Sequence, residues 1–399
     1  MQALRIAEIT AFFPPLTTGS SHFSADITNY LGSNGHIVKI FTCKLKGSEG
    51  PGSPRDSTID EIPAKWISLG ALSFNYAIPS ISLPNTVRRL YKDLDQFDPD
   101  IVHINGHFFD IGLWAARWAK QRSVPCVVTI HTPLLHVNRI ANKVLSLVDK
   151  HILARLLKGP KVKFVAVEGF TLRMYSERYK ISGDMISFIP ATSQMDVPKA
   201  SRQLDVVDKY QLQGKKVILS FGHVIPIRSR KPLVRALPRV LTEFPDLQLL
   251  IVGEVYDRSF ISLAEQLGVA HKISIVGRVP RDEVMSFFEV ADVECHDLED
   301  GHGLGMTSLE AMAAGVPIVA VIPTDSLPGI DLTDFSQMQI SSVAGQETLA
   351  ASLVRILRLS EADRAVLIEQ QRNFVQLHFS VTSVGDRYIE MFLALAQSN

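Results

Sequence analysis

Residues 299–317 read EDGHGLGMTSLEAMAAGVP, and this stretch joins a glycine-rich loop to a short helix. The run LEAMAA is rich in helix-forming residues, and Gly315 followed closely by Pro317 is typical of a helix end. We expect Thr307 or Ser308 to cap the helix N-terminus, because a side-chain oxygen there can accept a hydrogen bond from the first free backbone N–H groups. The stretch therefore predicts a loop that leads directly into a helix.

The glycines at 301, 303 and 305 lie in the loop that enters this helix. Such a loop leaves backbone N–H groups free and lets a ligand approach closely, while the helix dipole adds partial positive charge. The pattern favours an anion site, most simply for phosphate. Gly-rich turns before helices are also common for purely structural reasons, so the motif alone leaves both interpretations open.

The composition is that of a globular protein with balanced charge. The chain has 399 residues, enough for two domains with separate cores, and its 41 Lys and Arg residues balance 41 Asp and Glu residues. This balance gives no support to nucleic-acid binding. Cys43, Cys126 and Cys295 are far apart and outside CxxC or HxxC spacing, which argues against a disulfide framework and a structural zinc site.

The sequence carries no strong targeting or membrane-spanning signal. The N-terminal stretch MQALRIAEITAFFPP has too short an apolar run for a signal peptide, and no window approaches about 18 apolar residues. We expect a cytoplasmic protein. Peripheral contact with the inner face of the membrane stays open, because residues 139–164 mix apolar side chains with Lys and Arg.

Short β-branched runs alternate with helical patterns along the whole chain. The runs typical of buried parallel strands are LRIAEIT, HIVKIFT, DIVHING, PCVVTIH and KFVAVE in the first half, and KKVILSFG, LQLLIVGE, KISIVGR, VADVECHD and VPIVAVI in the second. Two successive βα arrays indicate an α/β protein with two doubly wound, Rossmann-like domains facing across a cleft. Ligands of such sheets bind at the carboxyl ends of the strands, so this cleft is the expected site.

The pattern also predicts the domain boundaries. A polar segment bracketed by prolines predicts a linker at 193–205, which separates an N-terminal domain at 1–192 from a C-terminal domain at 206–382. The amphipathic segment 383–397 predicts a final helix.

Several stretches match known landmarks in the same order. HGLGMTSLEAMAAGVPIVA follows the spacing E-G-F-G-x-x-x-x-E-A-M-A-x-G-x-P-V-V-A, while FFPPLTTGSS, GHIVKIFT, DPDIVHING, VVTIHTP and VILSFGHVIPIRSRKPLVRAL match the motifs that precede it. Together these stretches resemble the retaining glycosyltransferases of family 4, also called glycosyl transferases group 1. The likeness covers essentially the whole chain, and the combined order is more specific than any single motif.

The resemblance implies the GT-B fold and a hexosyltransferase-type enzyme. Its C-terminal domain would hold a nucleoside-diphosphate sugar, with UDP favoured over GDP, and its N-terminal domain would hold a saccharide, lipid-linked or small-molecule acceptor. In this fold the last helix, here 383–399, usually packs back on the first domain. The sugar would pass to an acceptor hydroxyl with retention of configuration, without a metal or another cofactor.

The resemblance places two catalytic candidates around the helix at 308–314. Glu310 corresponds to the second glutamate of the family's E-x7-E pair and would bind the nucleotide ribose, although a glutamate at a helix start is also stabilised by the helix dipole alone. Eight positions earlier, His302 stands where the family has its first glutamate. A histidine can exchange hydrogen bonds with sugar hydroxyls but supplies no fixed negative charge. Glu299 and Asp300 are nearby substitutes.

The diphosphate would lie beside a basic cluster. Lys231 corresponds to the family's diphosphate lysine, and Arg228 is a second candidate because the spacing is ambiguous by about three residues. His223 stands where the family usually has arginine, so a titratable group replaces a fixed cation. The alternative is that these residues form a solvated basic loop that binds no diphosphate.

Three residues of the first half are further candidates. His131 ends the run VVTIH, at a strand end that would face the cleft, and corresponds to the family's histidine near the transferred sugar. His107 would line the acceptor pocket, and Gly19 corresponds to one glycine of the family's Gly-Gly loop near the donor phosphate. A lone histidine more often has a structural role, and this alternative applies to both His131 and His107.

The remaining donor contacts come from loops of the second half. Gly253 and the pair Arg278–Val279 follow strand ends and would form the nucleotide-base pocket. The loop before the helix would supply the other contacts, from Gly303, Leu304, Gly305, Met306 and Thr307. The two histidines at 223 and 302 also motivate an alternative function, a catalytically weak nucleotide-sugar-binding subunit that supports an active partner.

Overall fold

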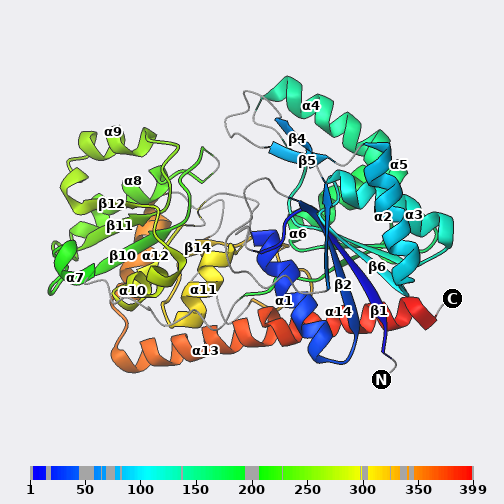
Figure 1. Ribbon diagram of the computed structural model, residues 1–399. Helices are drawn as coiled ribbons and strands as arrows, with labels where there is room; N and C mark the ends of the chain where they lie inside the picture. The colour runs from blue at the N-terminus through cyan, green and yellow to red at the C-terminus, as the bar shows by residue number, and fades with distance from the viewer. Residues whose placement is uncertain are drawn as a thin grey trace. The chain divides into compact units, whose positions relative to one another are not determined.

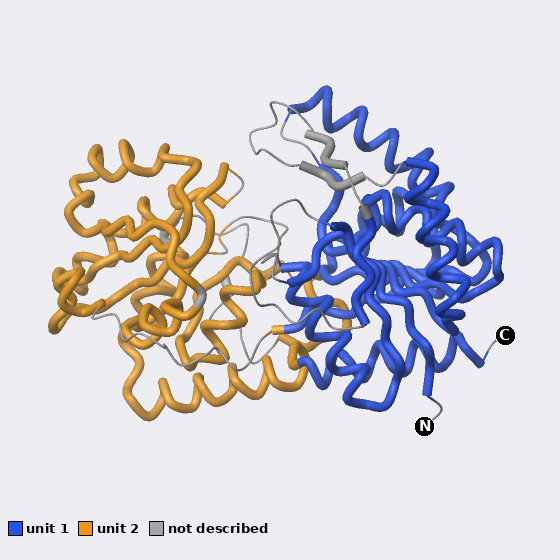
Figure 2. The backbone as a smooth tube through the Cα atoms, viewed as in Figure 1, with its two compact units in different colours: residues 1–192, 381–399 blue, residues 193–380 orange. Residues whose placement is uncertain are grey.

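The computed structural model describes most of the chain as two compact units (Figures 1 and 2). Unit 1 comprises Met1–Thr192 with Val381–Asn399, and unit 2 comprises Ser193–Ser380. The described residues are 3–14, 19–44, 58–63, 65–68, 77–80, 83–135, 138–193, 206–226, 228–296, 298, 304–323, 325–332, 339–340 and 346–397.

A seven-stranded parallel sheet forms the centre of unit 1. Its strand order is β3-β2-β1-β6-β7-β8-β9, and every pairing in it is parallel. The strands are β1 (Arg5–Thr10), β2 (Ile37–Lys44), β3 (Ile59–Pro63), β6 (Ile101–Asn105), β7 (Cys126–Ile130), β8 (Val162–Ala166) and β9 (Ile186–Phe188). β6 and β7 are buried along their whole length, as expected for strands covered on both faces. β4 (Lys65–Ser68) and β5 (Ala77–Ser80) form a separate antiparallel pair.

Helices cover both faces of this sheet (Figure 1). They are α1 (Gly19–Ser33), α2 (Pro84–Phe97), α3 (Asp110–Arg122), α4 (Arg139–Val148), the π-helical turn η1 (Asp149–Leu153), α5 (Ala154–Leu157), α6 (Gly169–Tyr179) and α14 (Val381–Gln397). One apolar cluster joins the sheet to α2, α3, α5 and α6, and a second joins it to α1 and α14. The two clusters are the two cores of a doubly wound layer arrangement.

The final helix α14 is an integral part of unit 1. Tyr388, Ile389 and Phe392 pack in one apolar cluster with Phe23 and Ile27 of α1. Gly385 makes the close approach possible, because a Cβ at this position would collide with the ring of Tyr30. Tyr30 in turn donates a hydrogen bond to Asp386 at 2.8 Å.

Unit 2 contains a second parallel sheet with the order β12-β11-β10-β13. Its strands are β10 (Val217–Phe221), β11 (Gln248–Val252), β12 (Ile273–Gly277) and β13 (Val293–Glu294), and β14 (Ala320–Val321) pairs with β15 (Gln339–Ile340). Its helices are α7 (Val206–Lys209), α8 (Lys231–Leu241), α9 (Ser259–Gln266), η2 (Ala270–Lys272), η3 (Arg281–Glu283), α10 (Val284–Glu289), α11 (Met306–Ala314), α12 (Gln346–Leu357) and α13 (Glu361–Phe379).

The sequence predictions of fold class and strand positions are confirmed. Each run predicted as a buried strand contains a parallel strand, although the strand in VPIVAVI, β14, pairs with β15 outside the two larger sheets. Among the helices of the described ranges, none is both long and apolar enough to cross a bilayer.

The N-cap of α11 lies two or three residues earlier than predicted. Gly305 is its N-cap, and neither Thr307 nor Ser308 caps it, so that prediction was wrong. The C-terminal prediction is confirmed, since Gly315 ends the helix in the left-handed conformation with φ 88°. Arg372 of α13 donates to the last carbonyls, those of Ala313 and Ala314, at 3.3 Å.

Candidate functional site

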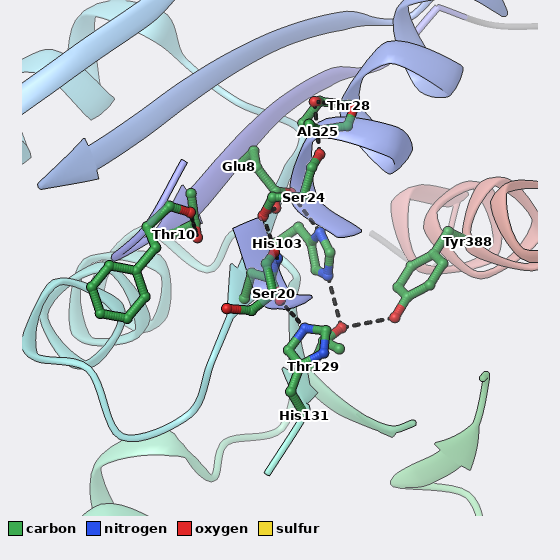
Figure 3. A network of polar contacts seen from close by, with 12 residues as sticks. Glu8, Thr10, Ser20, Ser24, Ala25, Thr28, His103, Thr129, His131 and Tyr388 are labelled. Atoms are coloured by element: carbon green, nitrogen blue, oxygen red, sulfur yellow. Dashed lines mark hydrogen bonds and ion pairs between the residues drawn. The ribbon is translucent and has the colours of Figure 1, made fainter. Parts of the chain in front are cut away.

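A buried carboxylate, Glu8 of β1, is the centre of a polar network in unit 1 (Figure 3). His103 lies opposite Glu8 on the neighbouring strand β6, and its Nδ1 is 2.5 Å from one carboxylate oxygen. Ser24 of α1 donates its hydroxyl to the other oxygen at 2.9 Å. All three side chains are fully buried, so these hydrogen bonds offset the cost of removing the carboxylate from water.

One branch of the network reaches the final helix. His103 Nε2 lies 2.8 Å from the Thr129 hydroxyl on β7, and that hydroxyl lies 2.9 Å from the Tyr388 hydroxyl on α14. Burial raises the pKa of Tyr388, so its phenol keeps its proton and can donate it to Thr129. The hydrogen bonds then run in one direction, from Tyr388 through Thr129 and His103 to Glu8.

The second branch reaches His131 at the end of β7. Ser24 accepts from the Asn105 amide nitrogen, and the Asn105 oxygen contacts His131 Nε2. Because the Asn105 nitrogen is the donor to Ser24, its oxygen accepts, and His131 carries its hydrogen on Nε2. Phe23 packs edge-on against the imidazole, with ring centroids 4.8 Å apart.

His131 is therefore held as a neutral imidazole. Burial lowers its pKa to about 3, and the neighbouring His103 and His107 act in the same direction. Its Nδ1 is left as a hydrogen-bond acceptor. A residue in this state can receive a hydrogen bond from a hydroxyl group and adds no positive charge.

His107 belongs to a separate buried cluster built around Asp149 of η1. Tyr175 and Tyr179 donate their hydroxyls to the Asp149 carboxylate at 2.9 and 2.6 Å, and Arg178 donates at 2.5 Å. His107 Nε2 lies 2.6 Å from the Tyr175 oxygen. Burial lowers the pKa of His107 to about 4, against the opposing pull of the Asp149 charge. Its Nδ1 has no hydrogen-bond partner among the described residues.

Gly19 is the first residue of α1, where backbone N–H groups are free of helical partners. A Cβ at Gly19 would meet no heavy atom of the described residues within 4 Å.

In unit 2, three strand-end glycines lie side by side. Gly222, Gly253 and Gly277 follow or end β10, β11 and β12, and each has a positive φ. Gly253 N–H donates to the Gly277 carbonyl at 2.8 Å, and a Cβ on Gly253 would lie 2.6 Å from the Gly222 carbonyl carbon. The backbones approach too closely for any side chain, so glycine is required at Gly253.

His223 follows the first of these turns. Its Nδ1 accepts a hydrogen bond from the Glu254 backbone N–H at 3.2 Å, and its ring contacts Tyr256 with centroids 6.0 Å apart. A backbone N–H can only donate, so in this arrangement Nδ1 carries no hydrogen and Nε2 carries one. The exposed side chain thus presents its Nε2–H as a donor.

The basic cluster surrounds the N-terminus of α8, whose first residue is Lys231. Arg230, which our sequence analysis did not select, is fully buried and donates to the Gly222 carbonyl at 3.1 Å and to the Arg228 carbonyl at 2.9 Å. Arg228 and Lys231 are partly exposed. The buried guanidinium therefore supports the turn, and the two exposed cations flank it.

The helix α11 brings its first turn to the same end of the sheet. Glu294 of β13 accepts from His296 Nδ1 at 2.5 Å and from the Ser308 hydroxyl of α11 at 3.1 Å. A Cβ at Gly222 would lie 3.4 Å from the His296 ring. His296 thus stands between α11 and the Gly222 turn.

The predicted donor residues of α11 lie at its N-terminal end. Leu304, Gly305, Met306 and Thr307 are partly exposed there, while His302 and Gly303 lie outside the described residues. Glu310 is the fifth residue of α11 and 8% exposed, so it stands in the second turn rather than at the helix start, where we expected it. The helix dipole is weaker in the second turn, so stabilisation by the dipole alone does not explain a glutamate at this position.

The structure groups some of the sequence candidates and leaves others apart. His223, Gly253, Lys231 and the first turn of α11 meet at the carboxyl end of the unit 2 sheet, directly or through Arg230 and His296. Arg278 and Val279 follow β12 at the same edge, exposed and partly exposed. In unit 1, His131 and His107 belong to different networks.

Sequence reasoning did not predict the contacts of the residues that hold these groups in place. These residues are Glu8, Ser24, Asn105, Thr129 and Tyr388 in unit 1, and Arg230, Glu294, His296 and Ser308 in unit 2. The available signal was a charged or hydroxyl residue inside an apolar strand, as for Glu8 and Thr129, because such a group must find a buried partner. No group of three or more His, Cys, Asp or Glu side chains within the described ranges could hold a metal ion.

Comparison with protein families decides the class of this chain. The description "Glycosyltransferase Family 4" matches residues 17–191, and "Glycosyl transferases group 1" matches residues 184–373. The chain belongs to the family 4-type glycosyltransferases. It is a sugar-transferring enzyme of the hexosyltransferase type.

Named relatives and solved structures agree with this class. Phosphatidyl-myo-inositol mannosyltransferase of Mycobacterium tuberculosis is 26% identical over 322 residues, which cover 79% of this chain and 77% of the relative. A second protein of that organism, GDP-mannose-dependent alpha-(1-6)-phosphatidylinositol monomannoside mannosyltransferase, is 24% identical and covers 79% and 80%.

The solved structures show the GT-B fold. A glycosyltransferase from Rickettsia africae superposes with a TM-score of 0.71 at 17% identity, over 100% of both chains. Anabaena HepE, solved with UDP and glucose, has a TM-score of 0.65 at 14% identity and covers 98% of this chain and 100% of its own.

Proposed function

We propose that this glycosyltransferase moves a hexose from a nucleoside-diphosphate sugar to a hydroxyl of a lipid-linked acceptor, with retention of configuration and without a metal. The observation that carries the proposal is the closely packed set of strand-end turns in unit 2, at Gly222, Gly253 and Gly277, beside the N-terminus of α8. These turns and the helix end present backbone N–H groups and cations to one anionic ligand.

The donor diphosphate would contact Lys231, Arg228 and the Nε2–H of His223. Lys231 lies near the Asp257 carboxylate. Burial raises the pKa of Asp257, but hydrogen bonds from Ser259 and Ser229 and, least, the charge of Lys231 lower it below its usual value. The leaving diphosphate gains negative charge, and these groups would stabilise it.

Glu310 would bind the ribose, and the residues after β12, Arg278 and Val279, would read the base. The sequence favoured uridine, whereas a relative named for GDP-mannose favours guanosine. GDP-mannose is therefore the first donor to test, with UDP-glucose second.

The acceptor would lie on unit 1. Relatives named for phosphatidylinositol substrates favour an acceptor on a lipid, which would bring the enzyme to the inner face of the membrane. The neutral His131 would accept a hydrogen bond from a sugar or acceptor hydroxyl through Nδ1, whereas His107 Nδ1 is buried and is not accessible to a ligand in this structure. The hydroxyl proton would pass to the departing diphosphate oxygen, so no protein base is required.

The experiment is nucleotide release from a panel of GDP-, UDP- and ADP-sugars, with and without EDTA. Release from one donor should fall at least about tenfold in Lys231→Ala and in Glu310→Ala, because each removes a donor contact. Lys209→Ala, an exposed lysine of α7, is the matched control and should retain activity. The anomeric configuration of the product, read by NMR, tests retention. Loss of release in EDTA would contradict the metal-independent mechanism.

A second candidate, a catalytically weak donor-binding subunit, rests on His223. Its Nε2–H replaces a fixed cation, which weakens the stabilisation of the leaving group. Tight donor binding with no release from any sugar, even with cell extract added, would favour this function. Restored release in His223→Arg would identify His223 as its cause.

A further inference from the structure

The helix α4 carries an apolar surface that its own unit does not cover. None of its residues is buried, although a surface helix of a globular protein normally buries one stripe. Ile140 is 77% exposed, Val144 54% and Leu147 51%, and Ile152 of the following η1 is 53% exposed. We name these four side chains the apolar ridge.

Three of the four side chains lie along one line. Ile140, Val144 and Leu147 have the spacing i, i+4, i+7, which places them on one face of an α-helix. Ile152 lies five residues after Leu147, in the π-helical turn η1 that directly follows α4, and extends the exposed apolar surface beyond the end of that helix. Figure 1 shows α4 at the outer edge of unit 1, with α5 continuing from it.

The buried cluster around Asp149 fixes which way the ridge faces. Asp149 is nine residues after Ile140, about half a turn round the helix from it. Its carboxylate is held by Tyr175, Tyr179 and Arg178 of α6. Because the opposite face is tied to α6 by these bonds, the ridge points away from the unit.

Basic side chains flank the ridge. Arg139, Lys143 and Lys150 are exposed and share one flank, at roughly 60–100° from the ridge for a helix of 3.6 residues per turn, and Arg155 is exposed as well. The only acidic residue between 138 and 158 is Asp149, which is buried and ion-paired. The exposed charge of residues 138–158 is therefore entirely positive.

We propose that the apolar ridge and its basic flank dock on an anionic lipid bilayer, with α4 lying in the plane of the interface. Ile140, Val144, Leu147 and Ile152 enter the boundary between headgroups and acyl chains, while the lysine and arginine stems extend to lipid phosphates. A zwitterionic bilayer has no net negative charge to attract the basic side chains of this flank. The proposal is independent of the donor sugar, because binding is measured without donor or acceptor.

The test is flotation of the full chain with vesicles, at low and high salt. Binding to vesicles containing about one-third phosphatidylglycerol should exceed binding to pure phosphatidylcholine, and salt should weaken it. The double variant Ile140→Gln with Leu147→Gln should reduce binding at least about tenfold. The double variant Lys143→Glu with Lys150→Glu should reduce binding by at least about fivefold per lysine, which corresponds to the attraction of one basic side chain to an anionic surface. Val366→Gln with Leu377→Gln, equally exposed apolar residues of α13, is the matched control and should bind normally.

A fluorescent label gives the orientation. All three native cysteines are buried, so a cysteine introduced as Val144→Cys can be labelled selectively with an environment-sensitive dye. Its emission should shift to the blue with anionic vesicles, and the same label at Val366→Cys should not respond.

Three outcomes would overturn the proposal. They are absence of flotation with every vesicle, unchanged binding of the ridge variant, and a concentration-dependent dimer that the ridge variant abolishes while vesicles bind neither form. The last outcome would make the ridge an interface between two copies. Nucleotide release by the ridge variant reports on the proposed function separately, since α4 contains none of the donor residues.

Discussion

The two units contain the same small polar cluster in different settings. In each, a buried glutamate on a strand accepts from a histidine Nδ1 at 2.5 Å and from a serine hydroxyl on a following helix. The sets are Glu8, His103 and Ser24 in unit 1, and Glu294, His296 and Ser308 in unit 2.

The clusters differ in what they hold. In unit 1 the cluster extends through Asn105 to the side chain of His131, and through Thr129 to Tyr388. In unit 2 the histidine packs beside the Gly222 turn, which is a backbone feature. Unit 1 therefore orients a side chain, and unit 2 shapes a backbone surface. We expect unit 1 to be most sensitive to the loss of polar groups and unit 2 to the addition of atoms.

The largest expected effect is that of Gly253→Ala in unit 2. The new Cβ would meet the Gly222 backbone, and φ is +129°, which L-residues rarely adopt. We expect a loss of roughly 3 kcal/mol or more in the free energy of unfolding, together with loss of donor binding. Urea denaturation measures the first and calorimetric titration the second. Gly32→Ala in α1, where a Cβ meets nothing within 4 Å, should instead be neutral or stabilising.

The second-largest expected effect is a loss of stability of unit 1 at acidic pH. The pKa of His107 falls from 6.5 to about 4 on folding because of burial. Between these values the unfolded chain binds a proton that the folded chain does not. His107 should therefore lower the stability of unit 1 on acidification, by up to about 1.4 kcal/mol per pH unit, and its contribution should level off below pH 4. His131, with a pKa of about 3, adds a similar slope that continues to lower pH. Thermal unfolding at pH 7, 6 and 5 measures it. His107→Gln should reduce the slope and leave the part that His131 contributes, and an unchanged slope in that variant would contradict the assignment.

Glu8→Gln and Glu294→Gln test the comparison directly. Each amide loses one acceptor oxygen, so each should lower the free energy of unfolding by about 1–3 kcal/mol. Only Glu8→Gln should also mobilise His131, which the imidazole signals in an NMR spectrum would report. Equal disturbance of His131 by both variants would break the distinction between the units.

Asn105→Asp also removes the amide donor to Ser24, but its effect of interest is a specific one on the pKa of His131. A carboxylate next to Nε2 favours the charged imidazole, so the pKa of His131 should rise from about 3 by about one unit or more. The acid limb of the rate profile should then move to higher pH, because a protonated Nδ1 no longer accepts a hydroxyl hydrogen. NMR titration of His131 gives the value, and Asn138→Asp, at the exposed cap of α4, is the matched control.

Local sequence patterns predicted the strands well because each strand is a short apolar run. They could not predict the polar networks, since those depend on which strands are neighbours. His103 meets Glu8 because β6 lies beside β1, 95 residues earlier in the chain. The Thr129–Tyr388 contact joins residues 259 positions apart. Helix α11 shows the same limit at its start. Serine is a residue type that often caps a helix N-terminus. The Ser308 hydroxyl instead donates a hydrogen bond to Glu294, and Gly305 occupies the cap position.

The return of α14 to unit 1 also has a consequence for synthesis. Phe23, Ile27 and Leu31 of α1 share a core with Tyr388 and its neighbours, so that core is incomplete until the whole of unit 2 has left the ribosome. At roughly 5–20 residues per second, translation of residues 193–380 takes about 10–40 s. During that interval the nascent chain exposes an apolar face of α1. Unit 1 therefore cannot complete this core before α14 has been synthesised. We expect chaperones that bind apolar segments of nascent chains to bind α1 during this interval.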